Sequence, residues 1–582
     1  MGYLLLWLES LTCSMLFISV AVACIARLSG RRRRFAAATL AILLPFAYYT
    51  ALTTLDAIVE IRYRVQAGWF WPAVVLTLAY LAGAIVLSTR GLMRAARDDR
   101  PLAASWPRGK LALALAAAVM LHTMTFSNLD ANAKQSLATV RAEATVLAMS
   151  VAPLRLPEQE NAVLVYQQAF EAFGANVGAT GLWPPIWHEA CEALTSPAEP
   201  KVDLRHIRGE QPEHIRDETL PPTPAFDFKN PALGDFLAQH AGELALVRLA
   251  TAKPGCYFDR DYARPTFDIP LPEIQGLSVA GRLLAMHARW SAEHDDLKGA
   301  LVDVGAMYGV ARHAGDEPLL VSFLVSVTID EMADATLEAV LNGRHPTFDE
   351  LAAVQIDGGV SHRRRFVHAM RMEEAFILNS IANLESMDLH TLGEWTNTQI
   401  PLFVLGFGGM YRVFFLSDDI AACRLAMHEY QRLPSLPYEE FDPAGLDLNM
   451  SRSPKGIVTG SFLPSLAPSV EMAFRADAQR RLAQTAMMMH EYYARHQTFP
   501  DNLHSPNLPR PVPRDLYNNK PIQLKKTANG WILYCVGPNL IDEGGEVTDR
   551  SNRVTRQGDL TFQYVEPKSP NEQPPAESNA EK

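Results

Sequence analysis

The sequence predicts a membrane-anchored, largely α-helical protein that ends in a small α+β module, a helix on an antiparallel sheet. Three observations predict this class. Residues 1–128 contain four apolar stretches, the next 300 residues carry apolar side chains at helical spacing, and three strand-like runs follow residue 520. The expected divisions are a four-helix transmembrane anchor (1–128), a helix-rich external domain (129–467), the α+β module (468–566) and a disordered tail (567–582).

The anchor prediction rests on length and on the placement of positive charge. A span needs about 20 mostly apolar residues, because each backbone polar group must be satisfied within the segment. The four candidates are Ser10–Ala26, Phe35–Leu55, Trp69–Leu87 and Leu111–Phe126. Arg31–Arg34 and the loop Arg90–Lys110 carry most of the positive charge between them, and such loops stay inside the cell. The sequence therefore predicts a multi-pass protein of the bacterial inner membrane, surrounded by the lipid bilayer, with a large periplasmic C-terminal part.

The fourth stretch leaves an alternative open. If it were only a core helix, the large C-terminal part would lie in the cytoplasm instead.

Charge is unevenly distributed along the chain. Residues 1–128 hold 13 Lys and Arg against 5 Asp and Glu, whereas the remainder holds 40 against 59. The formal net charge of −11 and a pI near 5.8 argue against a nucleic-acid partner, which requires a basic surface for the phosphates.

The external domain is expected to be a solenoid-like layer of helices. The predicted helices are 161–173, 233–252, 277–295, 298–314 and 318–342. The hairpin of the third and fourth helices is similar to a tetratricopeptide unit, with Ala300 as the small residue for close packing. One such unit does not make an array. Long loops near 196–228 and 433–468 contain six prolines each, and loops of this length are often binding segments or linkers.

The C-terminal module combines one amphipathic helix with a predicted sheet. The helix is Met472–His496, and the strands are Ile522–Lys526, Gly530–Val536 and Leu560–Tyr564. Asn529-Gly530 predicts a hairpin turn, since both residues tolerate positive φ. We expect Trp531–Val536 to be the central strand. The helix residues expected to face it are Phe474, Leu482, Met489 and Tyr493.

This order of elements resembles the globular part of the G-type major pseudopilins of type II secretion. The matching residues are Tyr493 with Phe499-Pro500, Asp515 with Lys520-Pro521, Leu533 to Asn539, and Gly544-Gly545 with Gly558-Asp559-Leu560. The resemblance covers about 95 residues. The chain lacks a prepilin-peptidase site and a long apolar N-terminal half of the module helix, so it resembles a borrowed pseudopilin-like module. The whole layout is also similar to uncharacterised bacterial multi-pass membrane proteins, which imply no activity.

The pseudopilin resemblance implies a calcium site in the loop Pro538–Asp559. Calcium takes 6–8 oxygen ligands. The candidate ligands are Asn539, Asp542, Glu543, Asp549 and Asp559. Asn539 stands where the family has Asp, and three arginines interrupt the loop. A solvated acidic hairpin is the alternative.

Other chemistry receives little support from the sequence. No G-x-S-x-G, P-loop or kinase signature is present. His490 and His496 are six residues apart, about 120° around a helix, which rules out the zinc-binding pair of H-E-x-x-H. His362, His368 and Glu373 fail for the same reason. The run Arg363–Arg365 is interpreted as a solvated face or an acid-pairing patch.

Four cysteines lie outside the predicted anchor. Cys191, Cys256, Cys423 and Cys535 allow two disulfides in an oxidising compartment, with three possible connectivities. Their wide spacing favours isolated buried thiols.

The expected function is that of a non-enzymatic scaffold or interaction protein with a protein partner at the external domain. A membrane-anchored periplasmic hydrolase, with acids scattered over the helical region, is one alternative. A component of a secretion or transport assembly is another.

Overall fold

The structure is a computed structural model that describes residues 108–173, 228–267, 269–356, 360–383, 412–413, 416–440, 466–546 and 558–566. These residues fall into two compact units. The first holds the described residues up to Ala142 together with those between Ser380 and Ala422, and the second holds the rest. Each unit is described by itself.

The first unit is built around the start of helix α4 (Arg108–Val151). The Asp130 carboxylate accepts a hydrogen bond from Arg412 Nε at 2.7 Å and lies 3.1 Å from Lys134 Nζ. Arg141 Nη2 donates to the Ala382 carbonyl at 3.0 Å. These contacts hold residues distant in sequence against α4.

The predicted membrane anchor requires correction. Within the residues that the structure describes, no helix is both long and apolar enough to cross a bilayer. This finding contradicts the four-span anchor and the multi-pass inner-membrane localisation derived from it. The predicted spans between residues 10 and 87 lie outside the described residues, and Leu111–Phe126 lies within α4.

The fourth predicted span illustrates the physical reason. At about 1.5 Å per residue, its apolar run is about 24 Å long, which is shorter than the ~30 Å hydrocarbon core. Helix α4 does not end where this run ends, but continues through Ser127, Asn128 and Asp130 to Val151. The prediction therefore treated the apolar start of a longer helix as a complete span.

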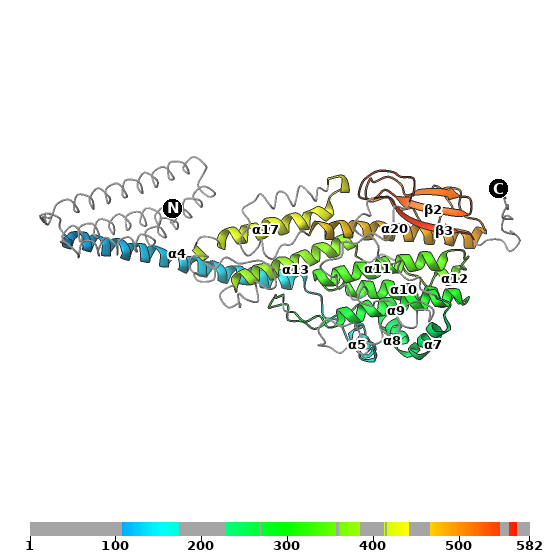
Figure 1. Ribbon diagram of the computed structural model, residues 1–582, viewed down its shortest axis with the longest axis horizontal. Helices are drawn as coiled ribbons and strands as arrows, with labels where there is room; N and C mark the ends of the chain where they lie inside the picture. The colour runs from blue at the N-terminus through cyan, green and yellow to red at the C-terminus, as the bar shows by residue number, and fades with distance from the viewer. Residues whose placement is uncertain are drawn as a thin grey trace, which may run out of the picture. The chain divides into compact units, whose positions relative to one another are not determined.

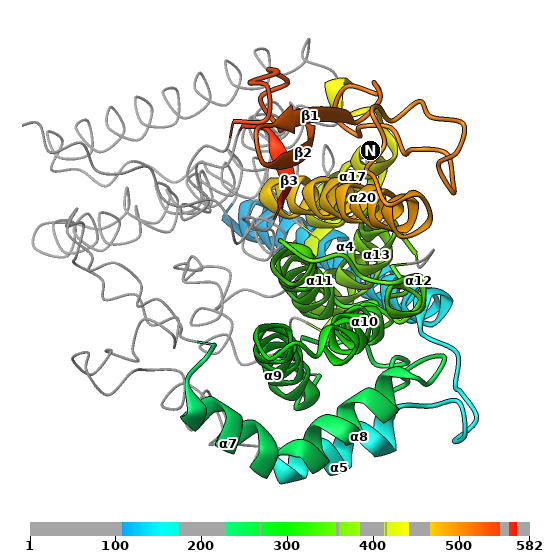
Figure 2. The ribbon, with the colours of Figure 1, turned by 90° about the vertical axis from the view of Figure 1, so that its right-hand side faces the viewer.

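The second unit is a stack of helical layers below a small sheet (Figures 1 and 2). An outer layer contains α5 (Val163–Ala172), α7 (Pro231–Gln239) and α8 (Ala241–Thr251). The next helices are α9 (Glu273–Glu293), α10 (Leu297–Ala314) and α11 (Leu320–Leu341). The helical region predicted from apolar spacing is thus present. Residues 233–252 form two helices rather than one, because His240 leaves helical geometry at φ −101° and ψ 20°.

The α9–α10 hairpin follows from local sequence signals. Asp296 caps α10 by accepting a hydrogen bond from Gly299 N at 2.9 Å. Ala300, predicted to be the small packing residue, is completely buried. The two helices therefore approach closely at this point.

The remaining elements bring the C-terminal part onto this stack. They are α12 (Phe348–Leu351), α13 (His362–Ala382), α17 (Leu416–Arg432), η2 (Leu433–Ser435), η3 (Tyr438–Glu440) and α20 (Ala467–His496). In Figure 2, α20 lies between α11 and the sheet, so that it has a buried face on each side. Phe474 was predicted to face the sheet, but its ring centroid lies 5.2 Å from that of Tyr438 in η3.

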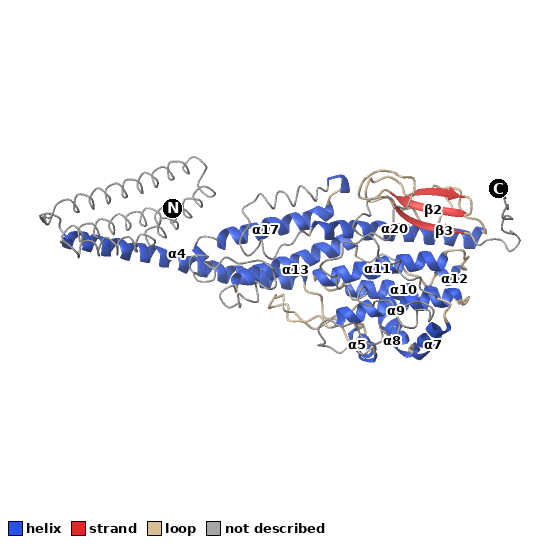
Figure 3. Cartoon of the chain, in the orientation of Figure 1, coloured by secondary structure: helices blue, strands red, loops and turns tan. Residues whose placement is uncertain are grey.

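The sheet consists of three antiparallel strands (Figure 3). They are β1 (Gln523–Thr527), β2 (Gly530–Cys535) and β3 (Leu560–Val565). The central strand is β2, as predicted, and its alternate residues Trp531, Leu533 and Cys535 are buried. The hairpin turn is Ala528-Asn529 rather than Asn529-Gly530. Gly530 instead begins β2 at φ +146°, where a Cβ atom would lie 2.0 Å from the Tyr564 carbonyl oxygen.

Candidate functional site

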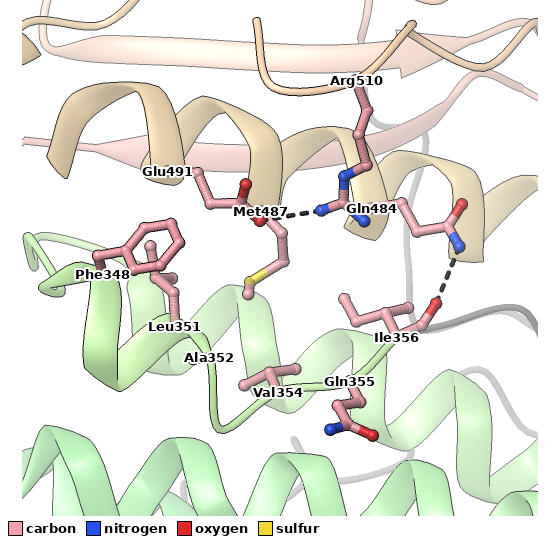
Figure 4. A pocket seen from close by; sticks show the side chains of 10 residues that line it. All are labelled: Phe348, Leu351, Ala352, Val354, Gln355, Ile356, Gln484, Met487, Glu491 and Arg510. Atoms are coloured by element: carbon pink, nitrogen blue, oxygen red, sulfur yellow. Dashed lines mark hydrogen bonds and ion pairs between the residues drawn. The ribbon is translucent and has the colours of Figure 1, made fainter. Parts of the chain in front are cut away.

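A pocket of about 240 Å³ lies between α12 with its following segment and the second half of α20 (Figure 4). Its walls come from parts of the chain that are more than 120 residues apart. The lining residues are Phe348, Leu351, Ala352, Val354, Gln355, Ile356, Gln484, Met487, Glu491 and Arg510.

Local interactions hold the two walls in place. Thr347 and Glu350 form a capping box that starts α12, in which Glu350 Oε2 accepts a hydrogen bond from Thr347 N at 2.7 Å. Gln484 Nε2 on α20 donates to the Ile356 carbonyl at 2.9 Å. This hydrogen bond joins the two walls directly, so the width of the pocket is set by the fold.

The pocket has an apolar floor and a charged rim. Leu351, Val354 and Met487 are buried and offer only apolar atoms to the hollow. At the rim, Arg510 Nη2 donates to Glu491 Oε1 at 2.9 Å. Figure 4 shows the Arg510 guanidinium reaching down towards Glu491, above Met487. The pocket thus presents one positive and one negative group beside an apolar surface.

The face of α20 that meets the helical layers carries ion pairs that are partly or largely buried. Arg480 pairs with Asp330, Arg475 Nη2 lies 2.9 Å from Glu331, and Arg363 Nε lies 3.1 Å from Asp477. Asp477 also accepts a hydrogen bond from His362 N at 2.8 Å. The Arg363–Arg365 run, interpreted as a solvated face or an acid-pairing patch, therefore includes an acid-pairing arginine.

Two acids one turn apart on α11 have opposite pKa shifts. Burial raises the pKa of Asp334 to about 8, and the neighbouring Asp330 charge adds to the rise. Burial also acts to raise the pKa of Asp330, but Arg480 and His362 outweigh it and lower the value to about 2. Tyr308 OH donates to Asp334 Oδ1 at 2.6 Å. Asp330 is therefore a buried carboxylate at neutral pH, whereas Asp334 holds its proton.

An aromatic cluster fills the space between α20 and the sheet. His490 is 1% exposed, and its ring packs edge-on against Phe499, Trp531 and Tyr564 at centroid distances of 5.2 to 5.9 Å. Neither of its ring nitrogens has a hydrogen-bond partner among the described residues. Burial, aided by the charge of His345, lowers the pKa of His490 to about 3. His490 is thus a neutral core residue, in agreement with the rejection of a zinc motif.

The structure brings three of the predicted calcium ligands together. Asn539 Nδ2 donates to Glu543 Oε1 at 2.6 Å, and Glu543 Oε2 accepts from Asp559 N at 2.8 Å. Asp542 lies in the same loop but accepts its hydrogen bond from Gly544 N at 3.0 Å. Asp549 lies outside the described residues.

These contacts do not amount to a metal cage. Within the described part of the chain, no group of three or more His, Cys, Asp or Glu side chains could hold a metal ion. Asp559 Oδ2 accepts from Gly545 N at 2.8 Å, while its Oδ1 is buried and has no hydrogen-bond partner among the described residues. Calcium binding by this loop stays a prediction.

One His–Asp pair resembles catalytic machinery but lacks its geometry. His287 Nδ1 lies 2.5 Å from Asp303 Oδ2 and 3.3 Å from Ser291 Oγ, and Arg248 Nε donates to Asp303 Oδ1 at 2.6 Å. A catalytic triad uses one ring nitrogen for the acid and the other for the nucleophile. Here both groups share Nδ1, so this cluster does not activate Ser291.

The described cysteines form no disulfide. Cys256, Cys423 and Cys535 are buried thiols, as favoured by their spacing, and Cys191 lies outside the described residues. Burial raises the pKa of the Cys256 and Cys535 thiols. Neither is therefore a reactive thiolate at neutral pH.

Comparison with known proteins adds no relative: no family model, curated protein or solved structure matches the chain. The resemblance to pseudopilins therefore stays a prediction.

Sequence reasoning missed the pocket. Gln484, Met487, Glu491 and Arg510 were not singled out as candidate site residues. No local pattern could have joined them to residues 348–356, because the two walls meet only in the folded chain.

Proposed function

We propose that the chain is a non-enzymatic binding protein whose second unit is a platform for the α12–α20 pocket. The observation that carries this proposal is the form of the pocket. It combines a hollow of about 240 Å³, an apolar floor and a small number of polar groups at the rim. Ligand sites typically have this composition, with apolar walls for affinity and few polar groups for orientation.

The surroundings of α20 support a preformed site. One face of the helix is covered by the sheet, and the other is held by the ion pairs with α11 and α13. Asp330 and Asp477 are buried, and breaking the pair of a buried carboxylate leaves an uncompensated charge, so these two pairs fix the position of the helix. A binding site on such an element needs little ordering when the ligand arrives.

The proposal is tested by filling the pocket. Ala352 lines it and is exposed, so Ala352→Trp should occupy the hollow without disturbing the core. Ala138→Trp, at an exposed position of α4, is the matched control. Each full-length protein is dialysed against a small-molecule extract of the source cells, and retained compounds are identified by mass spectrometry.

We expect the unsubstituted chain and the Ala138→Trp variant to retain the same compound, and the Ala352→Trp variant to lose it. If all three proteins retain the same compounds, or if none retains any, the pocket is not a binding site and the proposal fails.

A further inference from the structure

Resting on the binding role proposed above, we infer that the pocket takes a free α-amino acid with an apolar side chain. The inference comes from three properties of the site taken together. These are the pairing of opposite charges at the rim, the purely apolar floor and the small volume.

The rim offers one partner for each charge of a zwitterion. The Arg510 guanidinium is a bidentate donor suited to a carboxylate, and the Glu491 carboxylate is an acceptor suited to an ammonium group. In the structure these two side chains face each other at 2.9 Å. An α-amino acid carries both of its charged groups on one carbon atom, so it can insert between them and replace one ion pair with two.

The rim pair can open from its solvated side. The Arg510 side chain is 49% exposed and that of Glu491 is 16% exposed, and ion pairs near the surface contribute little to stability. Gln484 is not part of the rim pair, because its Nε2 donates to the Ile356 carbonyl.

The floor selects the side chain of the ligand. Leu351, Val354, Ile356 and Met487 are each buried and line the hollow without offering a charge. The volume of about 240 Å³ is below the ~300–1,000 Å³ of pockets for drug-sized ligands. A branched aliphatic side chain of leucine size satisfies both constraints, whereas glycine leaves the floor uncovered.

The test uses four probes on the full-length chain, measured by titration calorimetry. They are L-leucine, 4-methylpentanoate (no ammonium), 3-methylbutylamine (no carboxylate) and glycine (no apolar side chain). We expect leucine to bind at least tenfold more tightly than each of the other three. Arg510→Gln and Glu491→Gln should each weaken leucine binding at least tenfold, and Ala352→Trp should abolish it.

Lys526→Gln is the matched control. Lys526 forms an exposed ion pair with Asp501, 2.5 Å apart, outside the pocket, so this variant should bind leucine normally. Equal affinity for leucine and 4-methylpentanoate would show that the ammonium plays no part and would overturn the inference.

The two proposals fail in different ways. If none of the four probes binds but Ala352→Trp still removes a compound in the dialysis experiment, the binding role stands and the amino-acid inference is wrong. If the dialysis experiment also shows no difference between the unsubstituted chain and the Ala352→Trp variant, both proposals are wrong.

Discussion

Replacing Asp334 by asparagine should stabilise the protein at neutral pH. Asp334 is 2% exposed. The groups that face it are Tyr308 from α10, Asp330 and Glu331 from α11, and Arg480 from α20. Asparagine keeps the oxygen that accepts the Tyr308 hydrogen bond and removes the titrating group. The two folded proteins should therefore be close to isosteric.

The magnitude follows from the shifted pKa. The pKa of Asp334 is raised from 3.8 to about 8, so the folded protein holds a proton that the unfolded chain releases above pH 4. Each pH unit between these values lowers the stability of the unsubstituted protein by about 1.4 kcal/mol. At pH 7 the asparagine variant should therefore be more stable by on the order of 4 kcal/mol. Below pH 4 the difference should vanish.

The assay is urea unfolding of both proteins at pH 4 to 8. An infrared carboxylic-acid C=O band at pH 7, absent from the variant, would report the proton directly. Asp330→Asn is the internal control on the same helix. The pKa of Asp330 is lowered to about 2, so its ionised form contributes stability that is lost only as the pH falls through that value. This variant should be less stable at pH 7, by on the order of 2 kcal/mol. A stability difference for Asp334→Asn that is constant from pH 4 to 8 would refute the reasoning.

Two further predictions concern the C-terminal part. His490→Phe should be more stable at pH 7 by about 1–2 kcal/mol, because it removes a buried polar ring without hydrogen bonds. Because the pKa of His490 is lowered to about 3, the unsubstituted protein loses stability as the pH falls below 6.5, so the advantage should grow by pH 5 in urea unfolding; a smaller advantage there would contradict this. Millimolar calcium should raise the Tm of the full-length protein if the 538–559 loop binds the ion, and Asp559→Ala should abolish that rise. An unchanged Tm would leave the loop as an acidic hairpin held by its own backbone N–H groups.

The helices were predictable because their apolar side chains recur at helical spacing. In α10, the residues Ala300, Leu301, Val304 and Met307 are buried at helical spacing, and this periodicity is visible in one sequence. The central strand was predictable for the equivalent reason, since alternate residues of β2 are buried. The length of an apolar run was a poorer guide to structure. The run at residues 111–126 was interpreted as a membrane span, but it is only the start of α4.

The polar half of α20 could not be interpreted from the sequence. Asp477 and Arg480 lie off the apolar stripe of the helix, which for a helix with one covered face indicates solvent. Both are nevertheless largely buried in ion pairs, with Arg363 and Asp330, which precede them by more than 110 residues. The periodicity of a helix shows which side chains lie away from one buried face. It does not show whether another part of the chain covers those side chains. The same limit hid the pocket, whose walls also come from distant segments.

The two covered faces of α20 bear on whether residues 468–566 are a self-standing module. A module of that kind would keep its core between the helix and the sheet and expose a solvated outer face. In this structure the outer face carries Arg475, Asp477 and Arg480, whose partners all lie on α11 and α13. Removing α11 and α13 would leave these charges without their partners. The same face continues along the helix to Met487, which forms the floor of the pocket together with residues 351–356. The geometry therefore favours a single unit in which α20 joins the sheet to the helical layers. The pocket exists only in that unit, because one of its walls is α20 and the other is formed by residues 348–356.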